Sequence, residues 1–82
     1  MRKTIAQNMI DVLKKHHRNI IWYGDIDLIE ECALLSNMEI KHPQKTINNI
    51  LNALDRSELF FKHYIYSDHN GKRQKYRCFI MH

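Results

Sequence analysis

The pair Asn70-Gly71 constrains the fold of this chain more than any other feature of the sequence. It separates two stretches rich in aromatic and β-branched residues. Both central residues of a type I′ turn need positive φ, which Asn and Gly adopt readily. A turn centred on this pair predicts a β-hairpin whose cross-strand partners are Phe61 with Ile80, His63 with Cys78 and Ile65 with Tyr76.

This register predicts two unlike faces, because successive side chains of a strand point to opposite sides. The six residues paired above are nearly all apolar, and we expect their face to close the core. The opposite face is basic and aromatic, and we expect it to point outward; it pairs Lys62 with Phe79, Tyr64 with Arg77 and Tyr66 with Lys75. A shift of one residue would mix the two faces, which favours this register.

Three helices and one short strand are expected before the hairpin. Residues 4–17 form the first helix, with Thr4 as its cap, and residues 19–24 form a brief strand. The second helix runs from Asp25 or Asp27 to about residue 35, and the third begins at Pro43, which suits the first turn of a helix. The residues expected to point inward are Ile26, Ile29, Ala33 and Leu34, then Ile47, Ile50, Leu51 and Leu54; Trp22 and Tyr23 are also expected in the core.

The charge is unevenly distributed along a chain of 82 residues with a formal net charge of +4. Basic residues dominate both ends, and an acidic block lies between residues 19 and 42. A chain of this length builds one core, so residues 1–82 are interpreted as a single domain. The pattern predicts a molecule with one basic side that binds a polyanion.

Several protein classes find no support in the sequence. Two cysteines are too few for a disulfide framework, and neither a signal peptide nor an apolar run of membrane-spanning length is apparent. We therefore expect a cytoplasmic protein in a reducing compartment, without a membrane partner. No phosphate-binding glycine loop, nucleophile elbow or paired metal carboxylates occur, so we expect no enzyme and no cofactor. His63, Cys78 and His82 are candidate zinc ligands, but the sequence lacks a Cys-x-x-Cys pair, and a packed free cysteine is the expected role of Cys78.

The order of elements, the stretch "TINNILNALDRSELF" and the basic hairpin together resemble the winged helix-turn-helix DNA-binding family. The resemblance implies a small α+β fold of three helices, a short strand and a C-terminal hairpin wing. It also implies that the third helix enters the major groove while the wing lies on the DNA backbone. The implied recognition positions are Gln44, Lys45, Asn48, Asn49 and Asn52, and the implied wing contacts are His69, Asn70, Lys72 and Arg73, to which the charge pattern adds Lys75.

The residue types suit this role without the family. Asn and Gln on an exposed helix face make paired hydrogen bonds to adenine edges, and Lys or Arg at a hairpin tip neutralises phosphates. Plainer explanations stay open: an AT-rich gene enriches asparagine, and charged hairpin tips also discourage strand pairing.

The sequence thus predicts a small sequence-specific double-stranded DNA-binding protein, either a transcriptional regulator or a phage or plasmid accessory factor. A second apolar edge of the first helix, Ala6, Ile10 and Val12, leaves room for a homodimer. An alternative is a protein-interaction module that uses the acidic second helix. A third hypothesis is single-strand or RNA binding through Tyr64 and Tyr66.

Overall fold

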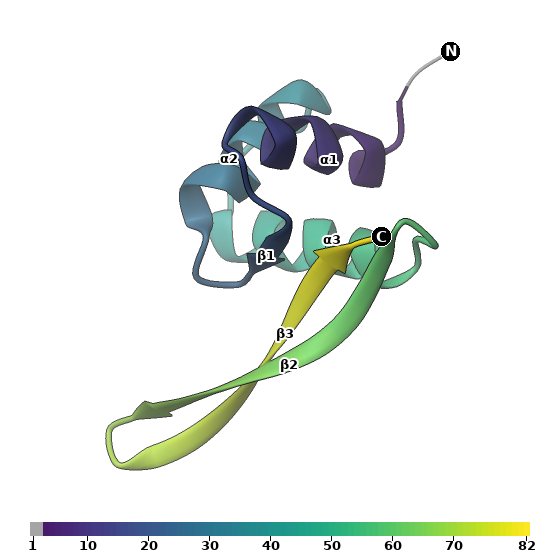
Figure 1. The fold of residues 1–82 in the computed structure, drawn as a ribbon. Helices are drawn as coiled ribbons and strands as arrows, with labels where there is room; N and C mark the ends of the chain where they lie inside the picture. Colours follow the sequence, from purple (N-terminus) through teal and green to yellow (C-terminus); the bar gives the residue numbers. More distant parts are fainter. Residues whose placement is uncertain (1–2) are drawn as a thin grey trace.

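The computed structural model describes residues 3–82, apart from the side chain of His69. Three helices gather at one end of the molecule, and two long strands run away from them as a twisted ribbon (Figure 1). The elements are α1 (Ile5–Lys15), β1 (Ile20–Trp22), α2 (Ile26–Leu35), α3 (Pro43–Asp55), β2 (Phe60–His69) and β3 (Lys72–Met81). The expected α+β class, with three helices before a C-terminal hairpin, is confirmed at this level.

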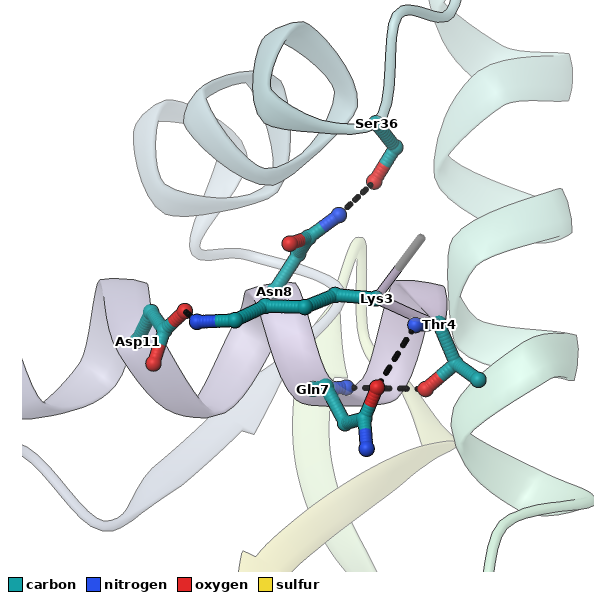
Figure 2. Close-up of polar contacts among 6 residues, drawn as sticks. All are labelled: Lys3, Thr4, Gln7, Asn8, Asp11 and Ser36. Carbon is teal, nitrogen blue, oxygen red and sulfur yellow. Dashed lines mark hydrogen bonds and ion pairs between the residues drawn. The ribbon is translucent and has the colours of Figure 1, made fainter. Parts of the chain in front are cut away.

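Helix α1 begins with a capping box, and Thr4 is its N-cap residue, as predicted. The Gln7 amide donates to the Thr4 hydroxyl, and the Thr4 amide donates to the Gln7 side-chain oxygen (Figure 2). This arrangement satisfies two amides that have no partner within the helix. The helix ends at Lys15, two residues before the predicted end, because His17 adopts left-handed backbone angles with φ of 56°.

A buried polar contact joins α1 to the end of α2. Asn8 is 8% exposed, and its side-chain nitrogen donates to the Ser36 hydroxyl at 2.9 Å (Figure 2). Nothing in the sequence pattern predicted this pair, because the two residues are far apart in the chain.

Helix α2 begins after Asp25, but the Asp25 side chain makes no capping hydrogen bond. Its carboxylate instead accepts two hydrogen bonds from the guanidinium of Arg18, at 3.1 and 3.0 Å, and one from the Trp22 amide. The carboxylate therefore ties the end of α1 to the loop after β1.

The buried side of α2 differs from the prediction. Ile29 and Ala33 are buried as expected, but Ile26 is 45% and Leu34 67% exposed. The helix turns Leu28 and Cys32 inward instead, so its contact stripe is displaced toward α1. A helix of only ten residues with apolar side chains on several sides does not reveal, from its sequence, which side packs against the core.

Helix α3 matches the prediction closely. Pro43 occupies its first turn, and the expected stripe of Ile47, Ile50, Leu51 and Leu54 is buried. Around this stripe the core contains Met9, Leu13, Ile21, Ile29 and Phe79, all fully buried. Ala6 and Val12 also lie in this core, so the α1 edge expected for a homodimer is largely used within the chain.

The sheet has the order β1-β3-β2 and is antiparallel throughout. All six predicted cross-strand pairs of the hairpin are confirmed, and Asn70 and Gly71 have φ of 52° and 73°. Strand β1 pairs only with residues 78–80 of β3. Beyond that contact, β2 and β3 continue as a two-stranded extension (residues 64–77). Hereafter the ribbon means residues 61–77, which include the three β2 residues opposite 78–80.

The assignment of the hairpin faces was wrong at the end that meets the helices, although Cys78 is buried and Tyr64 and Tyr66 are exposed as expected. Phe79, expected to point outward, is fully buried, whereas Phe61, expected in the core, is 51% exposed. The helices cover only the end of the sheet where Phe60, Phe79 and Ile21 lie on one side. The apolar content of the ribbon, which extends past the helices, therefore does not indicate the core side.

Trp22 is also not a core residue. It lies on the sheet face opposite Ile21 and Phe79, half-buried, with its ring edge-on to Tyr76 at 5.7 Å between ring centroids. The ring covers Gly24, where a Cβ would stand 2.2 Å from a Trp22 ring carbon. Glycine is therefore required at this position by the tryptophan.

Candidate nucleic-acid interface

The outward side of α3 carries every helix residue that the sequence singled out. They are all exposed: Gln44, Lys45, Asn48, Asn49 and Asn52. At 100° per residue these positions span an arc of about 140°, with Asn52 near its centre. The buried stripe occupies the opposite arc, so the polar face is uninterrupted along the helix.

Gln44 is held in place by a contact from the loop after β1. The Tyr23 hydroxyl donates to the Gln44 side-chain oxygen at 2.6 Å, and the Tyr23 ring stacks on Tyr76 at 5.8 Å between centroids. The first turn of α3 is thereby connected to strand β3 through two tyrosines. Tyr23 was predicted as core and is half-buried in this bridge.

A groove of about 410 Å³ separates α3 from the ribbon. Asn48 of the helix and Lys75 of the ribbon both line this groove. The sequence predicted each of them as a DNA-binding residue, but on separate elements. The remaining lining of the groove is Tyr23, Leu51, Gln74, Tyr76 and Arg77. A second hollow of about 340 Å³, on the other edge of α3, includes Lys45 and Asn49 together with the segment before the helix.

The base of the ribbon is anchored to the C-terminal end of α3 by Asp55. Its carboxylate lies 3.3 Å from the Lys62 ammonium and 3.4 Å from the Arg77 guanidinium. The hydrogen bond to the Asp55 carboxylate, together with the Asp55 charge, raises the pKa of Lys62. This carboxylate was not among the predicted site residues, because no local pattern in the sequence connects the last residue of α3 with Lys62 and Arg77 of the strands.

The tip of the ribbon is separate from α3. The turn lies at the end of the ribbon far from the helices (Figure 1), and Asn70, Lys72 and Arg73 are exposed there. The structure therefore brings Lys75, but not these tip residues, to the groove beside α3. The predicted contact His69 lies outside the described side chains.

Cations of the ribbon are stacked on its tyrosines. The Lys75 ammonium lies 3.9 Å from the Tyr64 ring centroid, and the Arg73 guanidinium lies 4.9 Å from that of Tyr66. Lys62 approaches Tyr64 at 5.9 Å. Both tyrosines remain open to solvent, with exposed fractions of 44% and 55%.

Most of the lysines and arginines of α3 and the ribbon have no carboxylate paired with them in the described part of the chain. Within residues 3–82, the lysines and arginines that no carboxylate pairs are Lys14, Lys45, Arg56, Lys72, Arg73 and Lys75. All but Lys14 belong to the exposed side or the C-terminal cap of α3, or to the ribbon. Apart from Lys14, the cations without a paired carboxylate therefore lie on or next to α3, which carries the exposed asparagines, and along the ribbon.

The acidic block is partly neutralised inside the molecule. Glu31 binds the Lys15 ammonium at 2.6 Å and the His16 ring at 2.8 Å, and these hydrogen bonds lower the Glu31 pKa. Asp25 is paired with Arg18 as described above. Glu31 thus joins α2 to the end of α1.

The cysteines are free and buried. Burial raises the pKa of Cys32 to about 11 and also raises that of Cys78. Among the described side chains, no three His, Cys, Asp or Glu residues come together as metal ligands.

Comparison of the chain with protein-family models, curated proteins and solved structures yields no match. None of the helices within residues 3–82 combines the length and apolar character needed to cross a membrane. The surface formed by α3 and the ribbon is therefore interpreted from its geometry and charge alone.

Proposed function

We propose that this chain is a winged helix-turn-helix protein that binds double-stranded DNA through α3 and the ribbon. One observation carries the proposal: the unpaired cations and the exposed amide side chains occupy the same two elements. The element order, and the sheet order with β3 in the centre, agree with that fold.

In the proposed complex α3 lies in the major groove, which is about 12 Å wide and admits a helix. Asn48, Asn49 and Asn52 offer both a donor and an acceptor, which is the pattern that pairs with the adenine edge. Gln44 is held by Tyr23 and orients the start of the helix.

The ribbon supplies phosphate contacts. Six residues of β3, Lys72–Arg77, precede the part that β1 pairs, and at about 3.3 Å per residue they extend roughly 20 Å. This length is sufficient to pass from the major groove across the neighbouring backbone. Lys72, Arg73 and Lys75 then lie along the phosphates, where binding releases counterions.

The role expected for such a protein is that of a transcriptional regulator or a phage or plasmid accessory factor. A homodimer on a twofold-symmetric site remains part of the proposal. With Ala6 and Val12 buried, its contact must use another surface than the α1 edge.

The decisive test is selection from random duplex DNA across a salt series. An enriched motif is expected, with log K falling against log salt at a slope of about −4 to −5 if the five unpaired cations of α3 and the ribbon all meet phosphates. Retention without any enriched motif contradicts base reading. No retention at low salt contradicts DNA binding.

A second candidate function is supported by the exposed side of α2. Ile26 and Leu34 are 45% and 67% exposed beside Asp27 and Glu30, an apolar and acidic surface that suits a basic protein partner. If this surface binds a basic protein, Leu34→Asp is expected to abolish the binding of that protein and to leave the retention of DNA unchanged. If the chain does not retain DNA, this surface becomes the leading candidate.

A further inference from the structure

One face of the ribbon collects nearly all of its charge and both of its exposed tyrosines. By strand alternation this face carries four cations, two tyrosines and one acid: Lys62, Tyr64, Tyr66, Asp68, Arg73, Lys75 and Arg77. The opposite face of the same stretch carries one lysine, Lys72. Solubility alone does not require such segregation, because charges on either face of an exposed ribbon meet solvent equally.

The rings on this face are about half exposed, and lysine and arginine side chains stack on them. An exposed cation–π contact changes an equilibrium constant by about two- to five-fold. A nucleic-acid base stacked on an aromatic ring contributes about five- to 150-fold. A base that replaces Lys75 over Tyr64, or Arg73 over Tyr66, is therefore favoured, and the displaced cation stays beside the phosphate of the same nucleotide.

We propose that Tyr64 and Tyr66 bind two unpaired bases, so that the preferred ligand is a duplex adjoining a single strand. The rings stand two residues apart in β2, about 6.6 Å, which is roughly twice the stacking distance of duplex DNA and fits an extended strand. Lys75 also lines the groove beside Asn48, so the single strand leaves directly from the duplex-binding side. This inference extends the proposed duplex-binding function and rests on it for the placement of the junction.

The experiment compares one duplex in blunt form, the same duplex with a single-stranded extension of eight thymidines, and the extension alone, by fluorescence anisotropy. We expect the extended duplex to bind at least tenfold more tightly than the blunt one. The double variant Tyr64→Leu, Tyr66→Leu is expected to lose this preference while its affinity for blunt duplex changes less than threefold. Tyr64→Phe, Tyr66→Phe keeps the rings and is expected to keep the preference.

Phe61→Leu provides the matched control, because Phe61 is an exposed aromatic residue on the opposite ribbon face. A 2-aminopurine in the extension gives a readout on the unmodified protein: stacking on a tyrosine quenches its fluorescence. Equal affinity for blunt and extended duplex, a preference that survives the leucine variant, or unquenched 2-aminopurine would each overturn the inference. Binding of the extension without binding of blunt duplex would instead refute the proposed duplex function and retain the tyrosine site.

Discussion

At the scale of single residues, two of the buried side chains, Asn8 and Cys32, have surroundings that determine their chemistry. Asn8 is a buried amide with one partner, the Ser36 hydroxyl, on another element. Cys32 is a fully buried thiol that contacts the carbonyl of Ile5 at 3.5 Å. Each of these two side chains leads to its own prediction about the free energy of unfolding.

Replacing Asn8 by alanine is expected to lower the free energy of unfolding by about 1–3 kcal/mol, because Ser36 loses its partner at the α1–α2 contact. Urea denaturation measures the change. Ser36→Ala and the double variant complete a cycle, in which we expect the second substitution to cost clearly less in the absence of the first. Additive losses would show that the two side chains are not coupled.

The pKa of Cys32, raised by burial to about 11, predicts that stability declines at alkaline pH. An unfolded thiol ionises near pH 8.5, as is usual for cysteine, whereas the folded thiol stays protonated, so the unfolded state binds fewer protons between these values. Stability is therefore fully present below about pH 8.5 and is lost progressively toward pH 11.

Urea denaturation at pH 8 and pH 10 tests this, with Cys32→Ala as the control. The decline is expected to be shallower in the variant, by up to about 1.4 kcal/mol per pH unit. In native protein the thiol should also react slowly with a disulfide reagent at pH 8, and rapidly in urea. Fast reaction of both cysteines in the native state would contradict the burial.

At the scale of elements, the orientation of the ribbon against α3 depends on few contacts. Asp55 pairs with both Lys62 and Arg77, and beyond them the ribbon has no helix against it (Figure 1). A two-stranded ribbon alone is marginally stable in water. Its cross-strand stacks of lysine and arginine on tyrosine compensate in part.

Asp55→Asn is therefore expected to loosen the ribbon with little loss of global stability, less than about 1 kcal/mol, because the pairs are partly exposed. Hydrogen exchange should accelerate at the amides of residues 62–77 and remain unchanged in α1. Releasing Lys62 and Arg77 should also steepen the salt dependence of DNA binding by up to about two units. Asp11→Asn, which breaks an exposed pair between Lys3 and Asp11 of α1, serves as the control and should change neither the exchange of residues 62–77 nor the salt slope.

The elements differ in how far local sequence determines them. Asn70-Gly71 determined the hairpin and its register, because turn chemistry acts over neighbouring residues. Which face of the hairpin is buried depended on how far the helices extend along the sheet, and for this reason Phe61 and Phe79 were exchanged. The same holds for Ile26 and Leu34 of α2, since a short helix with apolar residues on several sides takes its buried side from its neighbours.

At the scale of the whole molecule, charge is sorted by pairing. Carboxylates of the acidic block pair with Lys15 and Arg18, at and after the end of α1. Within residues 3–82, five cations of α3, its C-cap and the ribbon have no paired carboxylate. The sequence predicted that one side of the molecule is basic, but not which side. Lys15 and Arg18 lie in a basic stretch of the sequence, and in the folded chain carboxylates neutralise both of them. The predicted amide residues of α3 needed only helical spacing and were all exposed.

This sorting predicts that two kinds of variant will have different effects on DNA binding. Asn48→Ala is expected to cost about 1–3 kcal/mol on the selected sequence and little on random DNA, because it removes a base contact. Lys72→Ala should weaken both about equally and reduce the salt slope by about one unit. Anisotropy titrations on both ligands at several salt concentrations distinguish the two patterns, and equal losses for Asn48→Ala on both ligands would contradict its assignment.

The central position of β3 in the sheet has a consequence for the order of events during synthesis. Ile21 in β1 meets Phe79, so a strand made early in translation finds its partner only after the last core residue has left the ribosome. Until then the three helices close around a core that lacks Phe79, and the apolar residues of β1 have nothing to pair with. Since contacts so distant in sequence form late, the nascent chain is expected to remain protease-sensitive until residue 79 emerges, and then to become protected in a single step.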